Sequence, residues 1–214
     1  MKGGKRQQAY ELIKQKIFEG EYLPLSDISE EALQVELGIS RTPIREALQK
    51  LNKEGFVNVY PRKGTIVADI SLDMIRDLYE VRLLNEPFIT RQACGRLSSA
   101  WLSEMKAKFE NLPEDMRGNS EKEICRYGIE LDRELHGTIL RHSRNELLKG
   151  VMETVYDYSH WLRIRTSRAN REYSYSVREH LAIIDALMRQ DANMAEQASR
   201  KHVLAAQQVA FKYN

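Results

Sequence analysis

The chain has 214 residues, of which 42% are hydrophobic and 30% charged, and its formal net charge is +2. These values describe an ordinary globular protein with one large domain or two smaller ones. No apolar run reaches the roughly 18 residues that a membrane span needs, and the N-terminus leads into a polar helix instead of a signal-peptide core. We therefore expect a cytoplasmic protein with no membrane partner.

The first 70 residues predict three helices and a β-hairpin. Apolar spacing and end signals predict helices over 5–19, from a Ser29 cap to Gly38, and from Ser40 or Thr42 to Gly55. "FVNVY" (56–60) alternates as a strand does, "PRKG" predicts a turn, and "TIVADI" (65–70) predicts the returning strand. This order predicts a winged helix-turn-helix unit over residues 1–70.

The remaining chain, residues 71–214, predicts a second unit made of helices alone. Helical periodicity is found over 73–97, 99–111, 120–142, 145–168, 174–190 and 192–212. The predicted fold class is therefore mainly α, with an N-terminal winged helix-turn-helix followed by an all-α helical bundle. Ser71 caps the first helix of this bundle, so we expect a compact joint between the two units.

Positive charge is placed locally in the first unit. Residues 1–70 carry 11 Lys and Arg against 10 Asp and Glu, yet between residues 39 and 67 six basic residues face only Glu46 and Glu54. Arg41 and Arg45 lie one helical turn apart, opposite the apolar face of their helix. An arginine fork suits guanine in the major groove of DNA, which a helix can enter. The alternative is a solvated helix with routine surface arginines.

The predicted hairpin turn supplies a second basic element. Arg62 and Lys63 stand next to Gly64, whose missing side chain lets the backbone approach a groove closely. We expect this turn to contact DNA together with the preceding helix.

The segment "ISRTPIREALQKLNKEGFV", followed by "PRKG", resembles the recognition helix and wing of GntR-family bacterial transcriptional regulators. The resemblance implies DNA contacts from Ser40, Arg41, Thr42 and Arg45, with Gly64 at the wing tip. One departure lies in "LPLSDIS", where Leu25 stands at a position that is commonly glycine in the family. This departure concerns the turn ahead of the second helix.

Three of the five histidines can share a site with one aspartate. Asp132 and His136 are four residues apart on one helix face, and His180 and His202 each lie on a later helix. One carboxylate and three imidazoles suit a divalent transition metal, and facing helices of a bundle can bring such ligands together. The alternative is that each histidine packs or faces solvent on its own.

The second unit also resembles the FCD ligand-binding domain of the FadR-like GntR subfamily. The matching segments are "LDRELHGTILRHSRNELL", "REHLAIIDAL" and "ASRKHV". The resemblance implies a metal bound by Asp132, His136, His180 and His202 at the floor of a buried cavity, with zinc as the first candidate and nickel, manganese or iron as others. It also implies that Asn145 starts a helix and that Glu179 neighbours a ligand, while His142 and His160 match no ligand position.

"YEVRLLNEPFITRQA" resembles the first long helix of that domain, in which an arginine precedes a glutamate by four residues. Arg82 and Glu86 occupy these places. A buried arginine near a metal suits a carboxylate effector, because its guanidinium can take a carboxylate oxygen. An ordinary intrahelical pair between the two side chains is the equal alternative.

These features predict a ligand-responsive transcription factor that binds a pseudo-palindromic operator in double-stranded DNA as a homodimer. A small carboxylate is the expected effector. An alternative is a metal-responsive regulator, in which the divalent metal itself is the inducer. An enzyme is a further alternative, because an open metal position can activate water, but no separate general base stands beside the ligands and a DNA-reading unit would then be unexplained.

Overall fold

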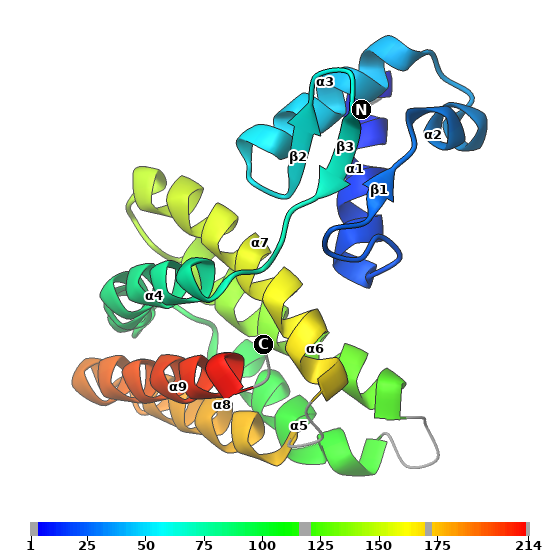
Figure 1. Cartoon of the computed structure of the whole chain (residues 1–214). Helices are drawn as coiled ribbons and strands as arrows, with labels where there is room; N and C mark the ends of the chain where they lie inside the picture. The colour runs from blue at the N-terminus through cyan, green and yellow to red at the C-terminus, as the bar shows by residue number, and fades with distance from the viewer. Residues whose placement is uncertain (1–3, 116–120, 170–172, 213–214) are drawn as a thin grey trace. The chain divides into compact units, whose positions relative to one another are not determined.

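The computed structural model describes residues 4–115, 121–169 and 173–212. The chain divides into two compact units, Met1–Ser71 and Leu72–Asn214. Figure 1 shows that the first unit combines short helices with the strands, whereas the second consists of long helices. The fold is therefore mainly α, as the sequence predicts.

The first unit begins with the three predicted helices, α1 (Lys5–Glu19), α2 (Glu30–Leu37) and α3 (Arg41–Lys53). The Ser29 hydroxyl caps α2 by accepting from the backbone N–H of Ala32 at 3.2 Å. Gly20 and Gly38 end α1 and α2 in the left-handed conformation that glycine adopts without strain. Ser40 stands at the N-cap of α3, but its side chain makes no capping hydrogen bond. The predicted cap from a Ser40 or Thr42 side chain is therefore not formed at that position.

A three-stranded antiparallel sheet completes the first unit. Its order is β1 (Asp27–Ile28), β3 (Gly64–Val67) and β2 (Val57–Tyr60). The hairpin of β2 and β3 is confirmed, although β3 ends at Val67 and not at residue 70. The sequence did not predict β1, because a two-residue strand is too short to show alternation.

In the segment "LPLSDIS", Leu25 takes the backbone conformation that is expected of the glycine common at this position. Its φ is +65°, Pro24 precedes it, and the Ser26 N–H donates to the Leu23 carbonyl at 3.0 Å. A type II turn has proline at its second position, a positive φ at its third position and a hydrogen bond from the fourth residue's N–H to the first residue's carbonyl. The turn is therefore retained without glycine, at the expense of strain in a leucine backbone.

A continuous apolar core holds the first unit together. α1 packs against α3, and α2 also packs against α3. Ile13, Leu33, Ile44 and Phe56 are fully buried, one from each helix and one just before β2. These contacts fix the direction in which the outer face of α3 points.

The second unit contains all six predicted helices. They are α4 (Leu72–Ala93), α5 (Ser99–Asp115), α6 (Glu121–Arg141), α7 (Glu146–Ala169), α8 (Tyr173–Met188) and α9 (Ala192–Lys212). The helix α4 ends four residues earlier than predicted, and Gly95 follows it with φ of +75°. The start of α7 is capped by the Asn145 side chain, which accepts from the Leu148 N–H at 3.1 Å. This confirms Asn145 as a helix-start residue.

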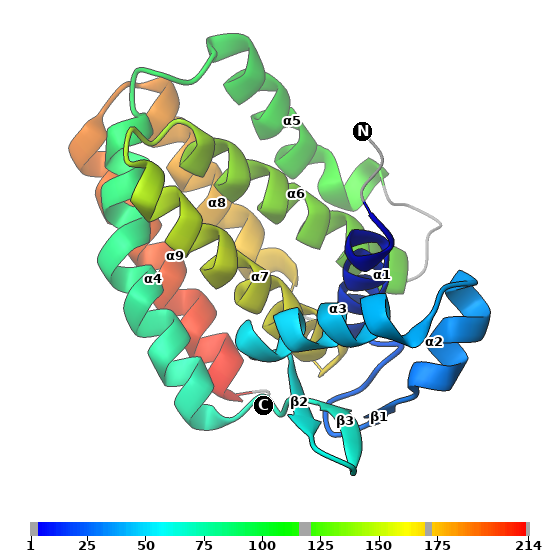
Figure 2. The same ribbon diagram turned by 90° about the horizontal axis from the view of Figure 1, so that it is seen from above.

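The packing order of the helices brings three of them around one centre. α9 packs against α4 and α8, α8 packs against α5, and α6 packs against α4, α5 and α7. Figure 1 shows α8 and α9 side by side, and Figure 2 shows α6 between α5 and α7. Because α4 packs against both α6 and α9, and α5 packs against both α6 and α8, residues of α6, α8 and α9 can face a common interior.

Candidate nucleic-acid interface and metal centre

The helix α3 has one buried face and one charged, exposed face. Ile44, Leu48 and Leu51 are at most 1% exposed. The side chains of Arg41 and Arg45 are 54% and 62% exposed. The spacing therefore places both arginines at the surface, as predicted, where a partner molecule can reach them.

Both arginines bond to side chains of α2, which the sequence did not predict. Arg41 donates from Nε to Gln34 Oε1 at 2.9 Å and from Nη2 to Glu31 Oε1 at 3.2 Å. Arg45 donates from Nε to both carboxylate oxygens of Glu30, at 3.1 and 2.9 Å. The α2 helix therefore carries the counter-charges of the predicted reading residues.

The hairpin turn presents its basic residues at a tight bend. Arg62 has φ of +64°, Pro61 precedes it, and the Lys63 N–H donates to the Tyr60 carbonyl at 3.1 Å. Gly64 has φ of +107°, and a Cβ built there would meet nothing within 4 Å. The backbone conformation, and not lack of space, is therefore what demands glycine at Gly64.

A basic groove of about 570 Å³ runs along α3. Its lining residues are Arg6, Thr42, Arg45, Glu46, Gln49, Lys50 and Lys53. Four of these seven are cationic and one is acidic, so the groove favours anions such as DNA phosphates. Sequence reasoning missed Arg6, because its distance along the chain from α3 hides their proximity.

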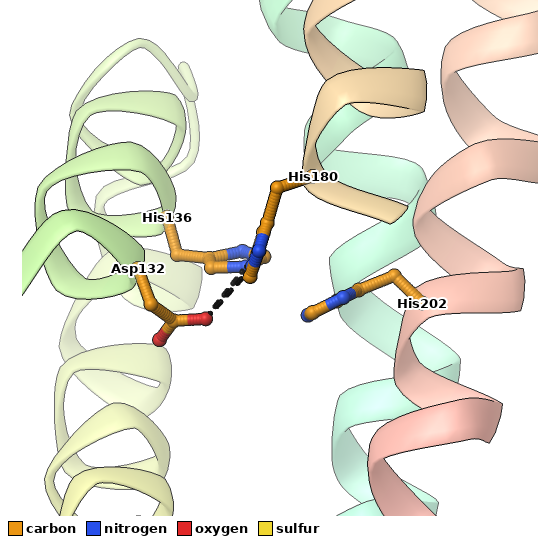
Figure 3. A group of neighbouring side chains, drawn as sticks. All are labelled: Asp132, His136, His180 and His202. Atoms are coloured by element: carbon orange, nitrogen blue, oxygen red, sulfur yellow. Dashed lines mark hydrogen bonds and ion pairs between the residues drawn. The ribbon is translucent and has the colours of Figure 1, made fainter. Parts of the chain in front are cut away.

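In the second unit, the four predicted ligands come together. Figure 3 shows Asp132 and His136 projecting from α6, His180 from α8 and His202 from α9 toward one point. One ligand atom from each lies within 4.8 Å of the others. His180 Nε2 is 2.9 Å from Asp132 Oδ1, and His136 Nε2 is 3.5 Å from the same oxygen.

The cluster fits a divalent metal. His136, His180 and His202 are at most 5% exposed. Neither ring nitrogen of His202 has a hydrogen-bond partner among the described residues. Buried polar atoms normally find a partner, and three imidazoles with one carboxylate suit a transition metal. These residues could therefore hold such an ion.

Two further carboxylates stand behind the histidine rings. Glu86 Oε2 lies 3.8 Å from His136 Nδ1, and Glu179 Oε2 lies 3.7 Å from His202 Nδ1. Acidic groups on the outer nitrogen of a ligand histidine orient the ring and raise its basicity. Glu179 is thus a neighbour of a candidate ligand, as the resemblance implied, whereas the role of Glu86 at His136 was missed.

Burial keeps His136 and His202 in the form that binds metal. Desolvation lowers the pKa of His136 to about 4, against the opposing pull of Asp132 and Glu86. Desolvation, aided by the nearby His180 and His136, lowers the pKa of His202 well below its usual range. Both rings are therefore neutral near pH 7, and neutral imidazole is the ligand form.

Arg163 of α7 is a member of the cluster that the sequence did not reveal. Its Nη1 lies 2.5 Å from Asp132 Oδ1, the oxygen that also faces His180. Burial raises the pKa of Asp132, but Arg163 and the two histidines outweigh burial and hold that pKa well below the usual range. Asp132 is therefore ionised, as a metal ligand must be.

Arg82 and Glu86 form an ion pair in the interior of the unit. Their side chains are 4% and 1% exposed, and Arg82 Nε donates to Glu86 Oε1 at 2.5 Å. The Arg82 guanidinium also stacks over Tyr79, 4.9 Å from the ring centre. The intrahelical pair is thus formed, but in a buried setting that links Arg82 through Glu86 to His136. The other two histidines, His142 and His160, are not part of the cluster.

Comparison with protein families now identifies the chain. Residues 5–67 match the model of bacterial regulatory proteins of the gntR family, and residues 77–205, more than half of the chain, match the FCD domain. The chain belongs to the GntR family. In this family the matched helix-turn-helix implies DNA binding, and the FCD domain implies a small-molecule effector.

Curated GntR relatives match nearly the whole chain. The uncharacterized HTH-type transcriptional regulator YdhC of Bacillus subtilis (strain 168) is 27% identical, over 92% of this chain and 85% of the relative. The HTH-type transcriptional repressor RspR of Escherichia coli (strain K12) is 24% identical, over the same shares of the two chains. This GntR-family protein is accordingly a transcriptional regulator and not an enzyme.

Solved structures support the same fold. The structure of E. coli McbR/YncC has a TM-score of 0.82 with this GntR-family chain and 18% sequence identity, and the match covers 100% of both chains. At this identity the likeness concerns the fold alone. Within the described residues, we find no helix with the length and apolar character needed to cross a membrane.

Proposed function

We propose that this GntR-family protein is a ligand-responsive regulator that binds a pseudo-palindromic operator as a homodimer. A small carboxylate effector, held next to a divalent metal in the helical unit, controls DNA binding. The observation that carries this proposal is the buried cluster of Asp132, His136, His180 and His202, in which the ring nitrogens of His202 have no hydrogen-bond partner among the described residues. Zinc is the first candidate metal, and nickel, manganese and iron suit the same ligands.

At the DNA, Arg41 and Arg45 would read base edges from the exposed face of α3. The other proposed contacts come from Ser40, Thr42, Arg62, Lys63 and Gly64. The Ser40 hydroxyl supports this assignment, because it makes no capping hydrogen bond to α3. The basic groove beside Arg45 would take flanking phosphates.

Arg82 and Arg163 are the proposed effector-binding residues. Arg82 is buried and forms an ion pair with Glu86, so an effector carboxylate would compete with the Glu86 side chain for the Arg82 guanidinium. Arg163 is 22% exposed and bonds the Asp132 oxygen that a metal would claim. A metal on Asp132 would compete with the Arg163 guanidinium for that oxygen, and an effector carboxylate could then pair with the same guanidinium.

Exposed apolar residues on α4 support the homodimer. Leu84 and Phe88 lie one turn apart and are 71% and 47% exposed. A homodimer would cover such a face, and a two-fold protein matches a pseudo-palindromic operator. Leu84→Glu should shift the protein toward monomer in analytical ultracentrifugation, whereas Leu204→Glu, at an exposed position on α9 (42%), should not.

Metal analysis of the purified protein tests the centre. Wild type should hold about one divalent ion per chain, and His180→Ala or His202→Ala should lose it together with any response to carboxylates. Arg163→Gln should keep the metal and weaken the carboxylate response. Arg91→Gln is the matched control, because this exposed arginine pairs with Glu196 away from the cluster. Stoichiometric metal in a protein lacking both His180 and His202 would refute the centre.

Titration of the metal alone separates the effector proposal from the metal-responsive alternative. If the metal is a fixed part of the site, operator binding should respond to a panel of small carboxylates at constant metal. If operator affinity instead follows free metal with no carboxylate present, the metal itself is the inducer. Convergence of ligands from α6, α8 and α9 would give such an inducer a means of changing helix packing.

A further inference from the structure

The contact between Arg45 and Glu30 leaves the far end of the arginine unused. Glu30 accepts from Nε alone, through both of its carboxylate oxygens. Neither Nη1 nor Nη2 of Arg45 has a hydrogen-bond partner among the described residues. A guanidinium carries five N–H donors, so four donors of this 62% exposed side chain remain for guanine O6 and N7.

Arg41 is held in a related way. Gln34 accepts from its Nε and Glu31 from its Nη2, which leaves Nη1 without a hydrogen-bond partner in the part of the chain that the structure describes. The supporting side chains all come from α2, and Glu30 and Glu31 lie in its first turn. Burial of Leu33 against the α3 core fixes α2 in this position.

These ion pairs are poorly placed to stabilise the fold. In the Arg41–Glu31 pair the side chains are 54% and 79% exposed, and in the Arg45–Glu30 pair they are 62% and 28% exposed. Pairs with such exposed members contribute little because water and salt screen them. They also place two carboxylates beside a surface that meets DNA phosphates. A carboxylate in that position lowers affinity for every DNA sequence. The two carboxylates therefore serve neither fold stability nor general DNA affinity.

We propose that Glu30 is a positioning residue that orients Arg45 for guanine, and that Glu31 with Gln34 does the same for Arg41. Each acceptor holds its arginine from behind and presents the remaining N–H groups to a base edge. The carboxylates thereby raise discrimination between sequences while they lower affinity for DNA in general. This inference rests on the proposed reading role of Arg41 and Arg45.

The test compares two duplexes by fluorescence anisotropy. One is selected by the protein itself from a randomised pool, and the other is a scrambled sequence of the same composition. Glu30→Ala should bind the scrambled duplex severalfold more tightly and should lower the ratio of selected to scrambled affinity by about tenfold. Glu30→Gln removes the charge but keeps an acceptor oxygen, so it should recover part of this ratio. Circular dichroism melting checks that each variant is folded.

Glu46→Gln provides the matched control. Glu46 is exposed on α3 beside Arg45, and no hydrogen bond or ion pair joins it to another described residue. Its loss should raise affinity for both duplexes by the same factor and leave their ratio unchanged. An equal rise of both affinities in Glu30→Ala would show that Glu30 merely repels phosphates, and would overturn the inference.

Arg45→Ala distinguishes failure of the inference from failure of the proposed reading role. If Arg45→Ala lowers selected-duplex affinity while Glu30→Ala leaves the ratio unchanged, the positioning role alone is wrong. If Arg45→Ala has no effect on the selected duplex, Arg45 does not read DNA and the positioning role falls with it. If Arg45 reads a guanine, replacing that guanine by 7-deazaguanine removes its N7 acceptor. This replacement should lower the affinity of Glu30→Ala for the selected duplex less than it lowers the affinity of wild type.

Discussion

Each unit contains an Arg–Glu pair on its helices, but the surroundings differ. Arg41 and Glu31 meet at the surface, with side chains 54% and 79% exposed, whereas Arg82 and Glu86 meet in the interior at 4% and 1%. The same ion pair is screened by water in the first case and unscreened in the second. In the first unit the arginine charge therefore stays exposed to a partner molecule. In the helical unit the buried pair instead lies beside the histidine cluster, through the contact of Glu86 with His136.

The largest expected effect follows from breaking the buried pair. Glu86→Gln leaves the Arg82 charge uncompensated in the core and should lower the free energy of unfolding by about 3 to 5 kcal/mol. Glu31→Gln, at the surface, should change it by about 0 to 1 kcal/mol. Urea unfolding followed by tryptophan fluorescence reports the helical unit specifically, because Trp101 and Trp161 both lie in it, and circular dichroism reports both units.

A double variant sharpens this comparison. Arg82→Met combined with Glu86→Met removes both charges and should recover much of the lost stability. Equal destabilisation by Glu86→Gln and Glu31→Gln would contradict the contrast between the two pairs.

Acid should destabilise the metal-free helical unit. Burial lowers the pKa of His136 from 6.5 to about 4, so between these values the unfolded chain binds a proton that the native chain does not. The contribution of neutral His136 to the free energy of unfolding is therefore fully present above pH 6.5 and is lost as pH falls toward 4. The loss is on the order of 3 kcal/mol for this residue. Below that, protonation of Asp132, whose pKa is also lowered, continues the loss. Urea midpoints by tryptophan fluorescence across this range measure the effect, and a flat profile would contradict it.

In the first unit, loss of an exposed arginine should lower DNA affinity and not the free energy of unfolding. Arg41→Ala or Arg45→Ala should each weaken operator binding by about 1 to 3 kcal/mol with no change in helicity. Lys63→Ala should weaken all sequences alike and reduce the slope of log affinity against log salt by about 1. Anisotropy titrations at several salt concentrations distinguish the two behaviours, and an unchanged midpoint for Arg41→Ala would remove that residue from the reading face.

The smallest expected effect concerns backbone strain in the first unit. Leu25 is 62% exposed and has φ of +65°, so Leu25→Gly relieves strain and loses little burial. After the greater flexibility of unfolded glycine is subtracted, stability should rise by about 0.5 to 1 kcal/mol. Leu25→Ala keeps the strain and should bring no such gain in a thermal melt followed by circular dichroism. A destabilised Leu25→Gly protein would show that the leucine side chain has a role of its own.

Local spacing accounts for what the sequence predicted well. Helical periodicity located α1 to α9 to within a few residues, since an amphipathic helix repeats its pattern over several turns. The same spacing placed Arg41 and Arg45 on an outer face and Asp132 and His136 on one face of α6. The strand β1 escaped prediction because two residues carry no period, and its pairing with β3 depends on chain folding.

By itself, the sequence determined the class of the fold, the family resemblance and the residue types at each candidate site, because these depend on neighbours three or four residues apart. Only the tertiary structure decided which distant side chains meet. It joined Arg45 to Glu30, Asp132 to Arg163 and His136 to Glu86, pairs separated by 15, 31 and 50 residues. It also decided whether each charge stands in water or in the core. Packing of apolar faces sets both outcomes, and no local pattern records them.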